Sequence, residues 1–197
     1  VEAHGIKYAA KTKLAADARH AVYSHSVAGA ILEKADFQVG IVGEVPGGIP
    51  AKCLIDILPR DDSPYAESIV DFKTISTGLD DDSVRKAIGK FGYHWQAAFY
   101  VSLTNKAYEA IGSKRRIKYF IFIFQDPSTL EVRVIRLDSG SLANGRNAVK
   151  CAVIEFVECA ANGIRSRYAD KMDVLELMPF HADADNQEVE IEAEGMQ

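Results

Sequence analysis

Residues 54–73 constrain the fold more than any other part of this 197-residue chain. They contain two apolar, β-branched runs separated by a loop with Pro, Asp and Ser, a pattern that predicts two neighbouring strands. Each predicted strand carries one carboxylate where a core strand is normally apolar, Asp56 in the first and Asp71 in the second. Because side chains alternate along a strand, Asp71 and Lys73 are expected on the same face. The segment therefore predicts two acids and a base close together in a sheet.

Burying two carboxylates and an ammonium in apolar strands is costly unless the groups pair or hold a cation. Mg²⁺ prefers carboxylate and carbonyl oxygens, and phosphodiester hydrolysis needs such a cation together with an activated, positioned water. Asp56, Asp71 and the Phe72 backbone carbonyl are therefore candidate metal ligands, and Lys73 is a candidate to hold the attacking water. The alternative explanation of the D-x-K pattern is a buried Asp–Lys ion pair that closes a sheet edge.

Periodicity and turn residues predict a series of helices and strands along the chain. In order, these are a helix over 7–34 with a break near 24–26, strands over 37–44 and 51–58 joined by Pro46-Gly47-Gly48, the Asp71 strand, helices over 84–90 and 93–111, strands over 117–124 and 130–137, and a helix over 139–162. This order predicts an α+β (mixed α/β) fold with a small central mixed sheet flanked by helices. We expect one domain over residues 1–180, with a short docked segment at 175–180, and an acidic, disordered tail over 181–197.

The net charge of −5 does not exclude a polyanionic partner, because residues 183–194 hold six acids and no base. Setting those six aside leaves 22 of the 28 acids against 23 bases. Three cysteines without C-x-x-C spacing, no signal peptide and no membrane-length apolar run predict a cytoplasmic protein with reduced thiols. Cys and His spacings predict no zinc or iron–sulfur site, and loop 43–48 lacks the Gly-Lys-Ser/Thr of a phosphate cradle.

Three ordered segments carry further motifs, at residues 51–56, 69–74 and 91–100. Together they resemble the "K-x-R-x-D", "V-D-x-K-T-T" and "Y-x-x-Q-A-A-x-Y" segments of the PD-(D/E)XK nucleases, and more narrowly of the exonuclease VIII (RecE-type) family, which is related to lambda exonuclease. The resemblance extends over roughly residues 21–180. It implies a restriction-endonuclease-like core.

The resemblance also implies roles for individual residues. It makes Asp56, Asp71 and the Phe72 carbonyl the metal ligands, and it implies that the catalytic residues are Asp56, Asp71, Lys73, Gln96 and Tyr100. Gln96 and Tyr100 are four residues apart on one helical face, where an amide and a phenol can brace the site or contact a phosphate. Taken alone, this spacing is equally that of an ordinary amphipathic helix.

An additional metal ligand is expected on the strand before Asp56, where the family often has Glu. The candidates here are Gln38, which stands nearest to that position, and Glu44 at the far end of the strand. This chain also has Leu54 where the family usually has Arg and Ile55 where it often has Pro. The Asp56 strand therefore lacks one phosphate-facing cation.

Four basic residues are candidate DNA contacts, three of them in a run at 114–116 that can bind the phosphate backbone. They are Lys52, Lys114, Arg115 and Arg116. The aromatic strand over 119–124 follows the basic run. Consecutive aromatics in a strand are usually core, so we expect these to pack inside rather than stack on bases.

The function implied by the resemblance is that of a Mg²⁺-dependent exodeoxyribonuclease in which Mn²⁺ can substitute. It would digest one strand of linear double-stranded DNA from a 5′ end and leave a 3′ single strand for a single-strand annealing protein, as in phage or prophage recombination. Processive relatives enclose DNA in a ring, which implies a homo-oligomer. An endonuclease or restriction-type enzyme on the same core, and a catalytically weak DNA-binding module, are the alternatives.

Overall fold

The computed structural model describes residues 2–163 of the chain, and side chains from residue 11 onward. Its elements are α1 (Glu2–Ser24), α2 (Ser26–Glu33), β1 (Ala35–Val45), β2 (Ile49–Pro59), β3 (Ser68–Thr74), α3 (Asp81–Lys90), α4 (Tyr93–Ala110), β4 (Tyr119–Gln125), β5 (Val132–Arg136) and α5 (Ser139–Asn162). The predicted α+β class is confirmed. The predicted boundary at residue 180, the segment over 175–180 and the acidic tail lie outside the described residues.

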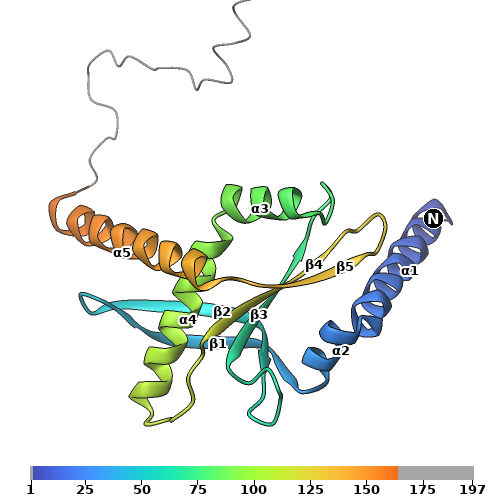
Figure 1. Ribbon diagram of the computed structural model, residues 1–197. Coiled ribbons are helices and arrows are strands. Elements are labelled where there is room, and N and C mark those ends of the chain that lie inside the picture. Colours follow the sequence, from blue (N-terminus) through green and yellow to red (C-terminus); the bar gives the residue numbers. More distant parts are fainter. Residues whose placement is uncertain (1, 164–197) are drawn as a thin grey trace, which may run out of the picture. The chain divides into compact units, whose positions relative to one another are not determined.

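The five strands form one mixed sheet in the order β1-β2-β3-β4-β5 (Figure 1). The β1–β2, β2–β3 and β4–β5 neighbours are antiparallel, whereas β3 and β4 are parallel. A parallel pair needs a long crossover, and α3 and α4 provide it here. The β1–β2 hairpin closes through Gly47 and Gly48, whose positive φ angles of 93° and 71° suit residues without a Cβ.

Strand β4 separates two hydrophobic clusters, because its side chains alternate between the faces of the sheet. Phe120, Phe122 and Phe124 are fully buried on the face that packs against α4. Ile121 and Ile123 point to the opposite face, where they pack with residues of α1 and α2. The prediction that the β4 aromatics are core is therefore correct for the three phenylalanines. Each contributes roughly 1.5–3 kcal/mol through burial.

Local capping explains where the helices begin and end. The predicted break in the first helix is confirmed at His25, whose extended backbone separates α1 from α2 and whose Nδ1 accepts a hydrogen bond from the Ala28 amide at 3.2 Å. Asp80 caps α3 by accepting from the amides of Asp82 and Ser83, both at 3.0 Å. Gly92 then turns the chain into α4 with φ of 65°. None of the described helices is long and apolar enough to cross a membrane.

Candidate active site

The site is located where β2 and β3 separate. The two strands form a bridge at Ile57 and Val70, so Asp56 and Asp71 occupy the next opposed position in the antiparallel register. On the other side of β3, the ladder with β4 continues to the pair Thr74 and Gln125. Strand β3 therefore stays paired with β4 along its whole length, whereas its other edge separates from β2. Asp56 and Asp71 lie where β2 and β3 separate, and we call this place the opening.

The alternation of side chains along β2 changes at Asp56. Ile55 packs in the cluster on the α4 face, whereas Ile57 packs in the cluster under α1 and α2. In a regular strand these two residues would share a face. Opposite Asp56 on β1, Gln38 has a φ of 53°, in the left-handed region that residues other than Gly rarely adopt. Both β1 and β2 are thus distorted where Asp56 lies beside β3. Backbone strain of this kind often marks a functional site.

Asp71 is 2% exposed and is held by side chains from two elements. Its Oδ2 lies 2.5 Å from the ammonium of Lys73, and its Oδ1 accepts a hydrogen bond from Gln96 Nε2 at 3.0 Å. Burial raises the pKa of the Asp71 carboxyl above its usual value, the Lys73 ammonium opposes that rise, and the neighbouring Asp56 carboxylate adds to it. The predicted adjacency of Asp71 and Lys73 is therefore seen, and Asp56 acts on the same carboxylate.

Helix α4 forms the wall behind these groups. The Lys73 ammonium lies 5.0 Å above the ring of Tyr93, which in turn packs on Phe122 with ring centroids 5.9 Å apart. Tyr100, one turn after Gln96, packs against the core ring of Phe120 at 6.5 Å. Burial raises the pKa of the Tyr100 phenol, and its hydrogen bond with Gln96 partly offsets this rise. The phenol is thus neutral at physiological pH.

Asp56 is held by one backbone and one side-chain donor. Its Oδ2 accepts from the Phe72 amide at 3.2 Å, and its Oδ1 accepts from Gln38 Nε2 at 3.3 Å. Of the two candidates for an additional ligand, Gln38 therefore lies in the site. Glu44 does not, because it pairs with Pro50 near the hairpin turn. Phe72 contacts Asp56 through its backbone amide. The role of the Phe72 carbonyl as a metal ligand stays a prediction.

The donor set fits a hard divalent cation. Lys73 neutralises one of two converging carboxylates, so one negative charge remains, and Asp71 Oδ2 is buried without a hydrogen bond of normal geometry. Within residues 2–163 no group of three or more His, Cys, Asp or Glu side chains is arranged to hold a metal. Two carboxylates are nevertheless a typical protein contribution to Mg²⁺, whose remaining ligands are waters and substrate phosphate oxygens. A plain Asp71–Lys73 ion pair would not explain why Asp56 converges on it.

The four predicted DNA contacts lie away from this opening. Arg115 is enclosed by the protein: its guanidinium donates to the backbone carbonyls of Pro59 and Ala66 and forms a 3.0 Å ion pair with Asp61. These bonds join the β2–β3 loop to the segment after α4, so Arg115 has a structural role and its predicted DNA contact is not supported. Arg116 donates to the carbonyl of its neighbour Arg115 at 2.9 Å.

The remaining two predicted contacts, Lys52 and Lys114, are exposed. Lys52 pairs with Val42 in the hairpin, four residues before Asp56. Lys114 precedes β4, whose first residue pairs with Ser68 at the end of β3 opposite Thr74. Neither residue is brought to the opening between β2 and β3.

Two grooves lie near the opening: Thr74 lines both of them, and Asp56 lines one. The α1 groove, about 640 Å³, lies between α1 and the sheet, and its wall includes Arg19, Tyr23, Phe37, Gln38, Asp56 and Thr74. The α3 groove, about 570 Å³, is lined by hydroxyl and lysine side chains that include Ser76, Thr77, Lys86 and Lys90. Sequence reasoning missed Lys86 and Lys90. Their spacing of four on the helix that follows Asp80 is common on amphipathic helices and gave no distinct signal.

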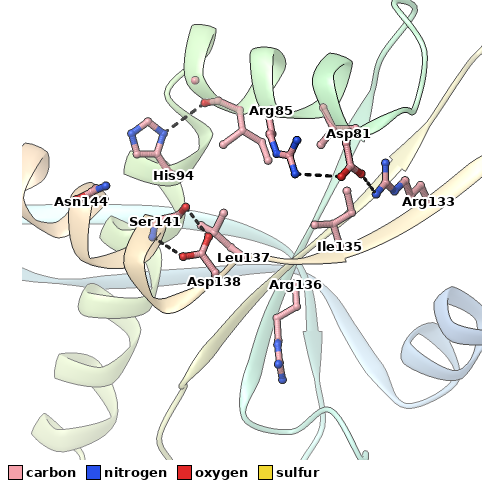
Figure 2. Close-up of a pocket in the computed structure, with 13 residues that line it drawn as sticks. Asp81, Arg85, His94, Arg133, Ile135, Arg136, Leu137, Asp138, Ser141 and Asn144 are labelled. Carbon is pink, nitrogen blue, oxygen red and sulfur yellow. Dashed lines mark hydrogen bonds and ion pairs between the residues drawn. The ribbon is translucent and has the colours of Figure 1, made fainter.

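A further cavity of about 510 Å³ between α3, β5 and the start of α5 does not belong to the site (Figure 2). Arg133 donates to Asp81 and to the Leu79 carbonyl, and Arg85 also pairs with Asp81, so these cations tie α3 to the edge of the sheet. Figure 2 shows Arg136 directed away from this group. Its guanidinium lies 4.9 Å from the Tyr119 ring. The charged groups of this cavity are thus engaged in holding the fold together.

The cysteines provide a test of the packing around the site. Burial raises the pKa of the Cys53 thiol, on β2, from 9.0 to about 11, whereas Cys151 on α5 is exposed. Because the thiolate is the reactive form, iodoacetamide at pH 8 is expected to alkylate Cys151 rapidly and to leave Cys53 unmodified in the native protein. Mass spectrometry of peptides after native and urea-denatured labelling checks this. Equal labelling of both thiols in the native state would contradict the burial of β2.

A mixed sheet whose parted strands carry two carboxylates and a lysine, faced by a glutamine on the crossover helix, defines a core of the PD-(D/E)XK type. Residues 2–178 match the family described as "PDDEXK-like domain of unknown function (DUF3799)", and the chain belongs to that family. The predicted resemblance is thereby confirmed at the level of the superfamily. No curated protein matches the chain.

Two solved structures resemble the chain to different degrees. The crystal structure of a protein from Eubacterium rectale named "Putative exonuclease" superposes with a TM-score of 0.58 and 17% identity, over 90% of this chain and 66% of that one. The chain thus spans just under two-thirds of that protein, and at this identity the likeness concerns the fold. The crystal structure named SSO0001 has a TM-score of 0.35 and 17% identity, over 75% of this chain and 69% of that one.

Proposed function

We propose that this protein is a nuclease that hydrolyses DNA phosphodiester bonds with the help of Mg²⁺, for which Mn²⁺ can substitute. The observation that carries the proposal is the convergence of Asp56, Asp71, Lys73 and Gln96 at the opening between β2 and β3. Membership of a PDDEXK-like family supports the same chemistry. Asp56 lines the α1 groove and Thr74, the residue after Lys73, lines both grooves, so an extended polymer has room beside the site.

Each residue has a task that follows from its contacts. A bound Mg²⁺ supplies charge neutralisation at the phosphate and lowers the pKa of a coordinated water. Asp56 and Asp71 would hold the cation, and Lys73, already fixed at 2.5 Å from Asp71, would orient the attacking water or stabilise charge on the phosphate. Gln96 holds Asp71 through Oδ1, while Oδ2 lies beside the Lys73 ammonium.

The α3 groove suits the sugar–phosphate backbone of the substrate. Lys86 and Lys90 line it together with hydroxyl groups, and both kinds of side chain bind phosphate oxygens without reading sequence. We therefore assign phosphate binding to these two lysines and not to Arg115. Binding through them is expected to weaken with rising salt, since each phosphate contact releases counterions.

At a finer level we propose a 5′-to-3′ exonuclease on linear duplex DNA that leaves 3′ single strands for recombination with an annealing partner, and that assembles as a homo-oligomeric ring. The exonuclease VIII motifs support this, as does the name of the Eubacterium rectale protein, of which this chain covers 66%. Linear duplex DNA labelled at the 5′ or the 3′ end, together with covalently closed circular DNA, tests the proposal in Mg²⁺. Loss of the 5′ label with intact circles is expected.

Other outcomes would select between the alternatives. Cutting of closed circles would identify an endonuclease on the same core. Tight binding without cleavage in Mg²⁺ or Mn²⁺ would identify a DNA-binding module and overturn the nuclease proposal.

Exchange of Gln38 for Glu provides a test of the metal site that does not depend on DNA. A third carboxylate beside Asp56 and Asp71 is expected to raise the affinity for Mn²⁺ about tenfold, because ligand charge strengthens binding of hard cations. Without metal, the same change replaces the amide that donates to Asp56 by a like charge and should lower the melting temperature. Isothermal titration with Mn²⁺ and thermal melts in EDTA measure both effects.

The matched control is Glu44→Gln at the far end of the same strand, which should change neither Mn²⁺ affinity nor its stoichiometry. If Gln38→Glu left Mn²⁺ affinity unchanged, Gln38 would not face the cation.

A further inference from the structure

The α1 groove has a wall that differs in chemistry from a phosphate-binding surface. Arg19 and Asp56 are the charged residues among those that line it, and its other walls are largely apolar. Phe37 is 50% exposed and Tyr23 is 46% exposed, although both line the groove. Large exposed aromatics beside a polar site are typical of a surface that binds a ligand.

The aromatic wall includes a cation. The Arg19 guanidinium lies over the Tyr23 ring, 5.0 Å from its centroid, which is a cation–π contact at the side of the groove. Arginine planes and aromatic rings are the groups on which proteins stack unpaired nucleobases. The guanidinium can in addition contact a phosphate of the same strand.

The groove is anchored to the sheet. Gln125, 3% exposed at the end of β4, donates through Nε2 to the Ala18 backbone carbonyl of α1 at 2.9 Å. On the other side, Gly29 of α2 approaches the Tyr23 carbonyl so closely that a Cβ at Gly29 would lie 2.4 Å from it. The backbone that carries Arg19 and Tyr23 is thus bonded to β4 and packed closely against α2.

We propose that the α1 groove binds an unpaired nucleobase of the strand being cut, next to the phosphate at Asp56. This inference rests on the proposed nuclease function and narrows its substrate to single-stranded or frayed DNA. A base within a duplex has its faces covered by its neighbours and cannot stack on Tyr23 or Phe37. Bases freed from the stack can, and Asp56 and Gln38 of the site themselves line the groove.

Binding in EDTA separates base stacking from backbone contact, because no cleavage occurs. The probes are fluorescent hairpin duplexes with a blunt end, with a four-nucleotide tail on either strand, or with the same tails made of abasic nucleotides. The wild-type chain is expected to bind a base-containing tail about tenfold more tightly than its abasic counterpart, in line with the stacking of one or two bases. Phe37→Ala and Tyr23→Ala should remove most of that difference and leave binding of the abasic tail unchanged.

Phe156→Ala is the matched control, since Phe156 is a 58% exposed phenylalanine on α5 outside the groove, and it should keep the tenfold preference. Phe37→Tyr should retain the preference because it keeps the ring. Equal wild-type binding of base-containing and abasic tails would overturn the inference, as would losses in Phe37→Ala that are the same for both tails.

Cleavage of the same probes in Mg²⁺ distinguishes the two proposals. If tails with bases bind preferentially but no probe is cut in Mg²⁺ or Mn²⁺, the proposal of nuclease activity is overturned and the proposal of base binding in the α1 groove is supported. If blunt, tailed and abasic probes are all cut at equal rates, nuclease activity is supported and base binding in the α1 groove is overturned.

Discussion

Replacement of Asp71 by Asn is expected to lower the rate of DNA hydrolysis by roughly 10³-fold, with little loss of fold. In the proposed mechanism Asp71 would supply one of two carboxylates to the cation, and its Oδ2 lies 2.5 Å from the Lys73 ammonium, so the change is expected to weaken charge neutralisation and to displace the ammonium. Asn keeps the size of the side chain. It also removes a carboxyl whose pKa burial already raises, which relieves the cost of its charge.

Initial rates on linear duplex DNA in saturating Mg²⁺ measure the effect, with melting temperatures in EDTA as the check on folding. Lys73→Met should lose roughly 100- to 1000-fold in rate, as expected for a preorganised charged donor. The matched control is Lys118→Met, which removes a 56% exposed lysine paired with Glu67 before β4. Its rate should stay within about twofold of wild type, since exposed ion pairs contribute little. Undiminished activity in Asp71→Asn would show that the hydrolytic site lies elsewhere.

The largest effect on stability is expected from Gly145→Ala in α5. A Cβ at Gly145 would lie 2.1 Å from the His94 carbonyl oxygen and 3.0 Å from the Ala98 Cβ, so α5 must move away from α4. Ala favours a helix over Gly by up to about 1 kcal/mol, but overpacking of this kind costs about 3 kcal/mol or more. Urea denaturation should therefore show a net loss of about 2 kcal/mol.

Gly89→Ala is the opposite control, because a Cβ at this position in α3 meets nothing within 4 Å. It should stabilise the protein by about 0.5–1 kcal/mol through helix propensity alone. Gly145→Ala should also reduce nuclease activity, since His94 is two residues from Gln96, which holds Asp71. Equal stability of the two variants would contradict the close packing of α4 on α5.

Local patterns in the sequence were sufficient for most of the fold. The helix break at 24–26, the hairpin through Gly47 and Gly48 and the cap at Asp80 all follow from short-range chemistry. Alternation along one strand was enough to pair Asp71 with Lys73. The motifs added Gln96, whose contact with Asp71 spans 25 residues of chain.

Long-range packing decided what the sequence left open. Arg115 belongs to a run of bases, yet carbonyls 56 and 49 residues away enclose its guanidinium. Lys86 and Lys90 gave no distinct signal, because a lysine pair on an amphipathic helix is ordinary until the helix is placed beside β3. The charge pattern of a sequence shows which side chains are ionic, whereas tertiary packing determines which of them can contact a substrate.

The sequence by itself determined that Asp71 and Lys73 share one face of a strand, because side-chain alternation is a property of the local backbone. Only the tertiary structure showed which of the two candidates for an additional metal ligand lies beside Asp56, namely Gln38 and not Glu44. That choice depends on the left-handed backbone of Gln38 and the change of face around Asp56, and both arise from the pairing of β1 with β2 and the separation of β2 from β3. The α1 groove has the same origin, since residues of α1, β1, β2 and β3 meet there through the folding of the whole sheet.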